Sequence, residues 1–106
     1  SPAVRLILSE RDEINEVAIL NGISLLQNRP NPAANKTTFT FELNSSRNVD
    51  FEIRDLSGRV VSRMEEGTLG AGTHTITYDV NTLSSGLYTY TLIADGISVT
   101  KKMTVK

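Results

Sequence analysis

The chain has no cysteine and no tryptophan, and its 106 residues include a single histidine. Without cysteine, thiolate nucleophiles and cysteine-ligated metal sites are excluded, although the redox compartment stays open. Without a second histidine, no pair of imidazoles can hold a metal ion. We therefore expect no catalytic residues, no metal site, no cofactor and no enzyme activity.

Balanced charge and the lack of long apolar runs exclude two further classes of protein. The net charge is -1, which argues against a nucleic-acid-binding surface. No apolar run approaches the roughly 20 residues of a transmembrane helix, and no signal peptide is present. We expect neither nucleic-acid binding nor direct membrane insertion. Because the chain starts at Ser1-Pro2 and not at Met, we expect a piece of a longer protein.

The clearest structural pattern lies in the last 24 residues, 83–106. Two alternating segments flank Asp95-Gly96, and both of these residues tolerate the positive φ of a two-residue hairpin turn. The turn predicts the cross-strand pairs Ala94–Ile97, Leu92–Val99, Tyr90–Lys101, Tyr88–Met103, Thr91–Thr100 and Thr89–Lys102. Because a slip of one residue would bury Ser98 and Thr100, the pattern specifies this register.

Leu83-Ser84-Ser85-Gly86-Leu87-Tyr88 precedes the hairpin and is similar to the tyrosine corner of immunoglobulin-like sandwiches. We expect Gly86 to turn the chain and the Tyr88 hydroxyl to bond to the backbone just before its strand. The alternative is an ordinary turn followed by a core tyrosine.

Five more segments predict strands, because apolar and polar residues alternate in them. They lie near residues 23–25, 38–43, 49–54, 60–64 and 73–80. Asp55–Arg59 predicts a turn with a glycine bulge that adjacent Val60 and Val61 fit. Residues 65–72 hold three glycines and predict a long surface crossing between sheets.

Seven strands separated by turn residues predict an all-β, antiparallel sandwich of immunoglobulin or fibronectin III type. We expect strands one, two and five in one sheet, and the other four in the second. Residues 1–22 leave three alternatives open: a short strand and helix, a hairpin around Asn21-Gly22, or a linker. We assign residues 1–22 to a linker or the end of a preceding domain, and 23–106 to the sandwich.

Few residues carry catalytic or binding chemistry. His74 falls on the inward side of its strand, which is typical of a packing or hydrogen-bonded rim group. Ser84 and Ser85 lack the G-x-S-x-G elbow of serine hydrolases. All six aromatic residues alternate in step with the apolar, core-facing residues of their strands, so none remains for a sugar-binding platform. Lys101 shares that parity, and two interpretations stay open: its side chain extends past Tyr90 to the edge, or it takes part in recognition.

Five short motifs follow one another in a distinctive order and spacing. They are Leu26-Gln27-Asn28-Arg29-Pro30-Asn31-Pro32, Asp55-Leu56-Ser57-Gly58-Arg59, Gly72-Thr73-His74, Leu83-Ser84-Ser85-Gly86-Leu87-Tyr88 and Lys101-Lys102-Met103. Each motif alone is common. Together, over roughly residues 23–106, they resemble the type A C-terminal sorting domain of the type IX secretion system.

The resemblance implies a transport signal on cargo of a Gram-negative bacterium. Such cargo crosses the inner membrane, passes through the periplasm and is recognised by an outer-membrane translocon through the folded domain. A sortase-like cysteine protease at the cell surface then removes the domain, which leaves the cargo at the surface or secreted. Cleavage would fall within residues 1–22.

The resemblance also implies which residues are recognised. They are Gly58, Arg59, Gly86, Tyr88, Lys101, Lys102 and Lys106, with Pro30, Asn31 and Pro32 forming the motif that opens the domain. An exposed last strand leaves a strand-exchanged dimer open. The alternative function is a fibronectin III-like spacer or adhesion module of a surface protein.

Overall fold

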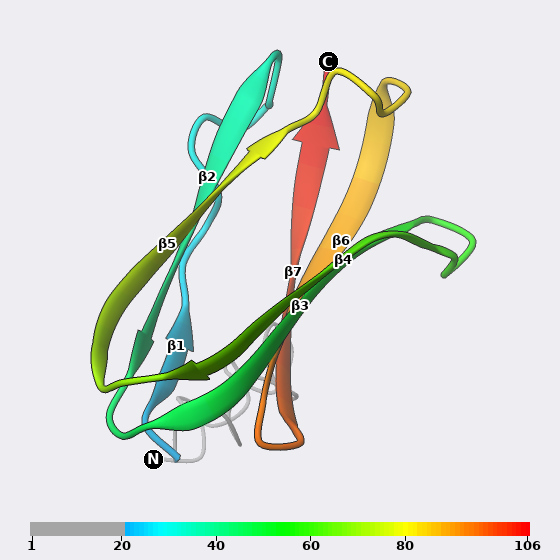
Figure 1. Ribbon diagram of the computed structural model, residues 1–106. Coiled ribbons are helices and arrows are strands. Elements are labelled where there is room, and N and C mark those ends of the chain that lie inside the picture. The colour runs from blue at the N-terminus through cyan, green and yellow to red at the C-terminus, as the bar shows by residue number, and fades with distance from the viewer. Residues whose placement is uncertain (1–20) are drawn as a thin grey trace, which may run out of the picture.

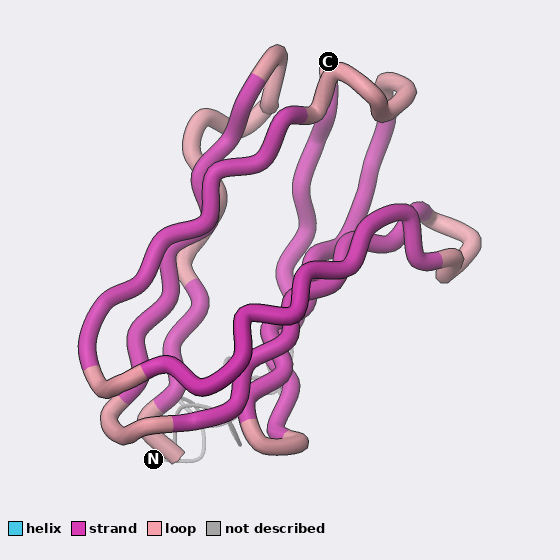
Figure 2. Tube along the Cα trace, in the orientation of Figure 1, coloured by secondary structure: helices cyan, strands magenta, loops and turns pink. Residues whose placement is uncertain are grey.

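The computed structural model describes residues 21–106, in which seven strands account for most of the chain (Figure 1). They are β1 (Ile23–Leu25), β2 (Lys36–Leu43), β3 (Arg47–Asp55), β4 (Val60–Leu69), β5 (Gly72–Asp79), β6 (Gly86–Ala94) and β7 (Ile97–Val105). Figure 2 shows only strands and loops in this span, so the described part of the chain holds no helix that could cross a membrane. Three alternatives were expected for residues 1–22: a short strand and helix, a hairpin around Asn21-Gly22, or a linker. They rest on residues 1–20, which lie outside the described residues.

The strands form two antiparallel sheets. The smaller sheet has the order β1-β2-β5 and the larger sheet the order β4-β3-β6-β7. This is the division predicted from the sequence, and the seven-stranded immunoglobulin-like sandwich is confirmed. The chain passes from one sheet to the other between β2 and β3, β4 and β5, and β5 and β6.

Aromatic rings join the two sheets at the centre of the core. Phe39 of β2 lies 4.7 Å, between ring centroids, from both Phe51 of β3 and Tyr90 of β6. All three side chains are fully buried. Tilted rings at this separation attract one another beyond the effect of burial alone. Phe39 is therefore the side chain around which the sheets meet.

The C-terminal hairpin has the predicted register. β6 and β7 pair Leu92 with Val99 and Tyr88 with Met103, and the other predicted pairs are also present. Asp95 and Gly96 have φ values of 49° and 82°, as a two-residue hairpin turn requires. Asp95-Gly96 thus determined the turn, and the alternation of apolar residues determined the face that is buried.

The length of β4 differs from the prediction. Residues 65–72 were expected to cross between the sheets, but β4 continues to Leu69, and Gly67 lies opposite Val49 of β3. A register shift beside Asp50 absorbs an extra residue as a bulge. Pairing with β3 outweighs the low strand propensity of glycine, so only Gly70 and Ala71 join β4 to β5.

A buried polar network fixes the segment between β1 and β2. The Tyr90 hydroxyl donates to the Leu26 carbonyl and accepts from the Asn28 amide, both at 2.9 Å. The Asn28 side chain donates to the Pro30 carbonyl at 3.1 Å and to the Thr37 hydroxyl at 3.0 Å. Burial raises the pKa of Tyr90 to about 12, so the hydroxyl keeps its proton at neutral pH. The network holds the segment in one conformation because buried polar groups need partners.

Replacing Tyr90 by phenylalanine should lower the free energy of unfolding by about 1–3 kcal/mol, measured by urea denaturation. The change leaves the Leu26 carbonyl and the Asn28 amide buried without their partner. Tyr78→Phe is the matched control, since the Tyr78 hydroxyl has no hydrogen bond within residues 21–106. Its effect should stay within about 0.5 kcal/mol. Equal losses in the two variants would contradict the role given to the network.

Candidate recognition site at one end of the sandwich

Strand register brings four separate segments to one end of the sandwich. Asp55, which begins the β3–β4 turn, lies opposite Tyr88 of β6. Gly86, which begins β6, lies opposite Val105 at the end of β7, and Val105 in turn pairs with Ala33. The β3–β4 turn, the tyrosine corner, the end of β7 and the opening motif therefore share what we name the motif end, in the upper half of Figure 1.

The carboxylate of Asp55 organises the β3–β4 turn. Its Oδ1 accepts hydrogen bonds from the Ser57 hydroxyl at 2.6 Å, the Ser57 amide at 3.0 Å and the Arg59 amide at 3.1 Å. Its Oδ2 accepts from Arg59 Nε at 3.2 Å. Gly58 closes the turn at a φ of 89°, which glycine adopts without strain. The register shift beside Val61 confirms the predicted bulge.

These hydrogen bonds lower the pKa of Asp55. The Ser57 hydroxyl is the largest cause, and the backbone amides and the Arg59 charge act in the same direction against the opposing effect of desolvation. The carboxylate therefore stays ionised at neutral pH and keeps Arg59 Nε engaged. The two terminal η nitrogens of Arg59 have no hydrogen-bond partner in the part of the chain that the structure describes.

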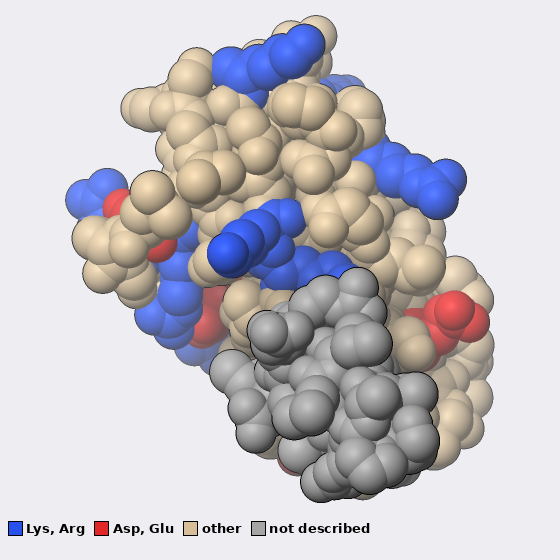
Figure 3. Space-filling model, turned by 180° about the vertical axis from the view of Figure 1, so that it is seen from behind, with Lys and Arg blue, Asp and Glu red and all other residues tan. Residues whose placement is uncertain are grey.

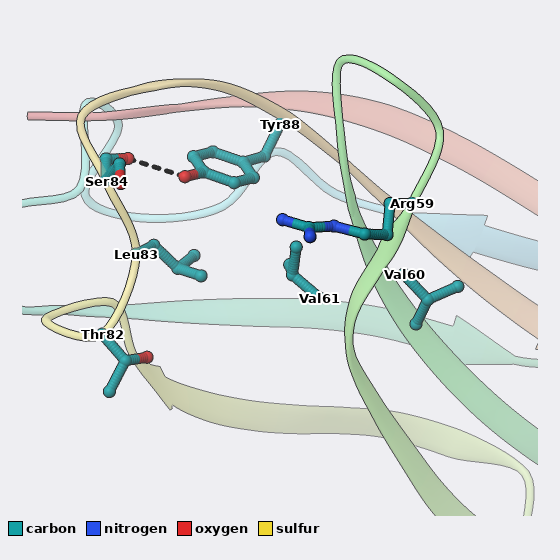
Figure 4. Close-up of a pocket in the computed structure, with 7 residues that line it drawn as sticks. All are labelled: Arg59, Val60, Val61, Thr82, Leu83, Ser84 and Tyr88. Carbon is teal, nitrogen blue, oxygen red and sulfur yellow. Dashed lines mark hydrogen bonds between the residues drawn. The ribbon is translucent and has the colours of Figure 1, made fainter.

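The β3–β4 turn faces the tyrosine corner across a pocket of about 460 Å³. The residues that line it are Arg59, Val60, Val61, Thr82, Leu83, Ser84 and Tyr88. Figure 4 shows the Arg59 side chain extending across the pocket toward Tyr88, with Val61 and Leu83 beneath it. The lining includes one cation and no carboxylate. Two predicted recognition residues from different motifs, Arg59 and Tyr88, thus share one concave surface.

The predicted tyrosine corner is present. The Tyr88 hydroxyl donates to the Ser84 carbonyl at 2.7 Å, the bond dashed in Figure 4. Tyr88 is 7% exposed, so its ring packs into the core and closes the back of the pocket. Gly86 has a φ of 150°, a conformation that would strain any side chain although the space around it is open. Gly86 therefore lets the chain turn into β6, and Tyr88 fixes the preceding loop through its bond to the Ser84 carbonyl.

The opening motif holds the end of β7. The Thr104 amide donates to the Asn31 side chain at 3.0 Å, and the Ala33 amide donates to the Thr104 carbonyl at 2.8 Å. The Lys106 amide donates to the Ala33 carbonyl at 2.9 Å. Three bonds thus occupy the outer edge of the strand end, where a second chain would otherwise pair.

The three lysines predicted for recognition do not form one cluster. Lys106 lies at the motif end with an exposed side chain, whereas Lys101 and Lys102 lie opposite Tyr90 and Thr89, farther along β7. Lys102 is exposed and Lys101 is half-buried on the inward parity. From behind, the Lys and Arg side chains in Figure 3 are spread over the surface in separate groups.

His74 lies away from the motif end, beside the β4–β5 connection. Its ring centroid is 5.5 Å from that of Phe41, and Nε2 lies 2.7 Å from the Gly70 carbonyl oxygen. These contacts are those of the hydrogen-bonded rim group predicted from the sequence. Residues 21–106 contain no group of three or more His, Asp or Glu side chains that could hold a metal ion.

Residues 29–106 match the family described as the secretion system C-terminal sorting domain. The chain belongs to this family, the sorting domains of type IX secretion. The family implies that cargo reaches the surface or the outside of a Gram-negative cell. A sorting role and an immunoglobulin-like fold suggest a non-catalytic domain. The resemblance drawn from the five motifs is confirmed.

Solved structures share the fold of the sorting domain. PorZ of Porphyromonas gingivalis, an essential surface component of its type IX secretion system, has a TM-score of 0.56 and 18% identity, over 84% of this chain and 12% of PorZ. A DUF3244 family protein of Bacteroides vulgatus has a TM-score of 0.54 and 18% identity, over 79% of this chain and 96% of its own. FlgD of Xanthomonas campestris has a TM-score of 0.53 and 22% identity, over 88% of this chain and 74% of FlgD. At such identities the likeness shows the fold alone. No curated protein sequence matches the chain.

Sequence reasoning missed part of the site of the sorting domain. Thr82 was given no role and Leu83 only a place in the tyrosine-corner motif, because only the folded chain brings them beside the β3–β4 turn. Three of the four exposed large apolar residues among residues 21–106 lie at the motif end: Leu56 at 73%, Leu87 at 48% and Val60 at 40%. Leu56, an apolar residue within the otherwise polar turn Asp55–Arg59, was the sequence feature that could have indicated an exposed apolar surface.

The carboxyl pKa of Asp55, followed by NMR titration, should lie below the usual 3.8. Ser57→Ala should raise it, since the largest stabilising hydrogen bond to the carboxylate is lost. Because the folded-state pKa is the lower one, the stabilisation is complete above the unfolded pKa and is lost as the pH falls through the folded pKa. Ser45→Ala, far from the turn, should leave the value unchanged. A wild-type pKa at or above 3.8 would contradict this account.

Proposed function

We propose that the outer-membrane translocon of the type IX system recognises the motif end of the folded sorting domain. The observation that carries the proposal is the meeting of four segments on one surface, although they lie up to about 70 residues apart. A partner that binds after folding contacts a shape, so it can use residues from distant parts of the chain. Exposed apolar side chains beside a cation suit such an interface.

The predicted recognition residues divide into two kinds of role. Arg59 and Lys106 present charge at the motif end, and Tyr88 closes the back of the pocket that Arg59 lines. Gly58 and Gly86 act through the backbone, because both hold positive φ values at the turns that shape the surface. Lys101 and Lys102 lie farther along β7 and would make a separate contact.

Pro30, Asn31 and Pro32 would act indirectly. Asn31 binds the Thr104 amide, and Ala33, the next residue after Pro32, pairs with the end of β7. The opening motif would therefore present the C-terminal residues in a fixed position and lower the entropy lost when a partner binds. The same pairing opposes a strand-exchanged dimer through this end of β7, since three bonds would first have to break.

We further propose that a sortase-like cysteine protease removes the domain by cutting within residues 1–22. Ile23 of β1 is fully buried and β1 pairs with β2, so a cut inside 23–106 would break the sandwich. Residues 1–22 then serve as a linker or as the end of the cargo domain. The cargo would pass through the periplasm before it reaches the surface.

Fusing the 106-residue chain to a secreted reporter in a type IX-competent cell should place the reporter at the surface. Removing residues 102–106 should leave it in the periplasm, because the trimmed chain loses Lys106 and the pairing with Ala33. Lys106→Glu, which keeps the backbone bond, should reduce surface reporter severalfold. Glu66→Lys, an exposed charge change at the other end of β4, is the control and should export normally.

Two outcomes would overturn the proposal. An intact fusion that stays in the periplasm removes the sorting role. A trimmed fusion that still reaches the surface favours a fibronectin III-like spacer or adhesion module. N-terminal sequencing of the domain released from the surface would test the removal step, with a cut inside residues 1–22 as the expected result.

A further inference from the structure

We propose that the pocket between the β3–β4 turn and the tyrosine corner receives an aspartate or glutamate side chain of the recognising protein, bound by Arg59. The inference rests on the proposed function and names the chemistry of the partner at its centre. It follows from the state of Arg59, the lining of the pocket and the rigidity of the turn.

Arg59 has donors that the fold leaves unused. Asp55 binds Nε at 3.2 Å, while the η nitrogens have no partner within residues 21–106, and the side chain is 77% exposed. Arg54 differs, since its η nitrogens bind Glu52 at 2.9 Å and the Gly58 carbonyl at 2.8 Å. A guanidinium held at Nε still offers its two terminal NH2 groups, which can donate side by side to the two oxygens of a carboxylate.

The pocket favours an anion over a neutral ligand. Its lining holds one cation, no carboxylate, and the apolar side chains of Val61 and Leu83 (Figure 4). Arg59 is the one charged side chain in this lining, and its exposed guanidinium attracts an opposite charge that enters the pocket. The carboxylate of Asp55 binds Arg59 through Nε and is otherwise held within the turn, so it leaves both η nitrogens to a second carboxylate. Charge complementarity therefore selects an acidic partner residue.

The size of the pocket and the apolar side chains at its rim indicate which partner residue would lie next to the acidic one. A volume of about 460 Å³ is in the range of sites that bind small molecules, so it has room for more than one carboxylate group. Val60 lines the pocket and is 40% exposed, and Leu56 projects from the same turn. An apolar residue next to the acidic one on the partner would cover these side chains. Because the turn is fixed by Asp55 and Gly58, binding would order little of the domain.

Photo-crosslinking in cells tests the inference directly. A benzoylphenylalanine replaces Thr82, which is exposed and lines the pocket, in the reporter fusion. The peptide captured from the partner should contain Asp or Glu. Replacing that residue by Lys should restore export of the Arg59→Glu fusion. Captured peptides without an acidic residue, or export without any capture, would overturn the inference.

A charge series separates the pocket contact from overall charge. Arg59→Gln should lower surface reporter at least about fivefold, and Arg59→Lys less, since lysine keeps the charge but loses the paired geometry. Lys36→Gln removes the same charge from an exposed site outside the pocket and should stay within about twofold. Equal losses for Arg59→Gln and Lys36→Gln would overturn the inference. Thermal unfolding of each purified chain checks that the variants fold.

A binding experiment with the purified chain tests the pocket separately from the sorting role, because it does not need the secretion machinery. The ¹⁵N-labelled chain is titrated with N-acetyl-Leu-Glu amide and with its Leu-Gln counterpart. The glutamate peptide should shift the amide signals of Arg59, Leu83 and Ser84, and the glutamine peptide should bind about tenfold more weakly. Equal shifts with both peptides, or shifts with neither, would overturn the inference whatever the reporter does.

Discussion

A β-strand alternates its faces with a period of two, so the register of one central strand decides what its neighbours can present. In this domain that strand is β6, which pairs with β3 on one side and with β7 on the other. The pair Asp55–Tyr88 sets the β3–β4 turn beside the tyrosine corner, and the pair Gly86–Val105 sets the C-terminus at the same end. A slip of β6 would separate these segments and bury polar residues.

Tyr90 ties this strand to the opening motif. Its ring packs against Phe39 of the opposite sheet, while its hydroxyl bonds to the backbone at Leu26 and Asn28. One side chain thus joins the core, the smaller sheet and the irregular segment that leads to the end of β7. Such a fully satisfied network favours a single arrangement, because each alternative leaves a buried polar group unpaired.

The motif end combines a turn made by local hydrogen bonds with a pocket made by the packing of the sandwich. The Asp55 carboxylate and the glycine at position 58 form a turn whose hydrogen bonds all join residues close in sequence. The pocket, however, exists only because the sandwich places that turn against Leu83 and Tyr88. Arg59 keeps Nε engaged with Asp55 while its two η nitrogens have no partner within residues 21–106, which makes a turn residue a candidate ligand-binding group.

The sequence by itself determined the division of strands between the sheets, the hairpin at Asp95-Gly96, the tyrosine corner and the family. These depend on alternation, on turn residues and on motif order, all of which can be read along the chain without knowing which residues meet in space. The tertiary structure alone decided the full length of β4, which depends on pairing with β3, and the separation of Lys101 and Lys102 from Lys106. It also decided which residues line the pocket, because Arg59 and Leu83 are 24 positions apart in sequence and meet only through pairings made by other strands.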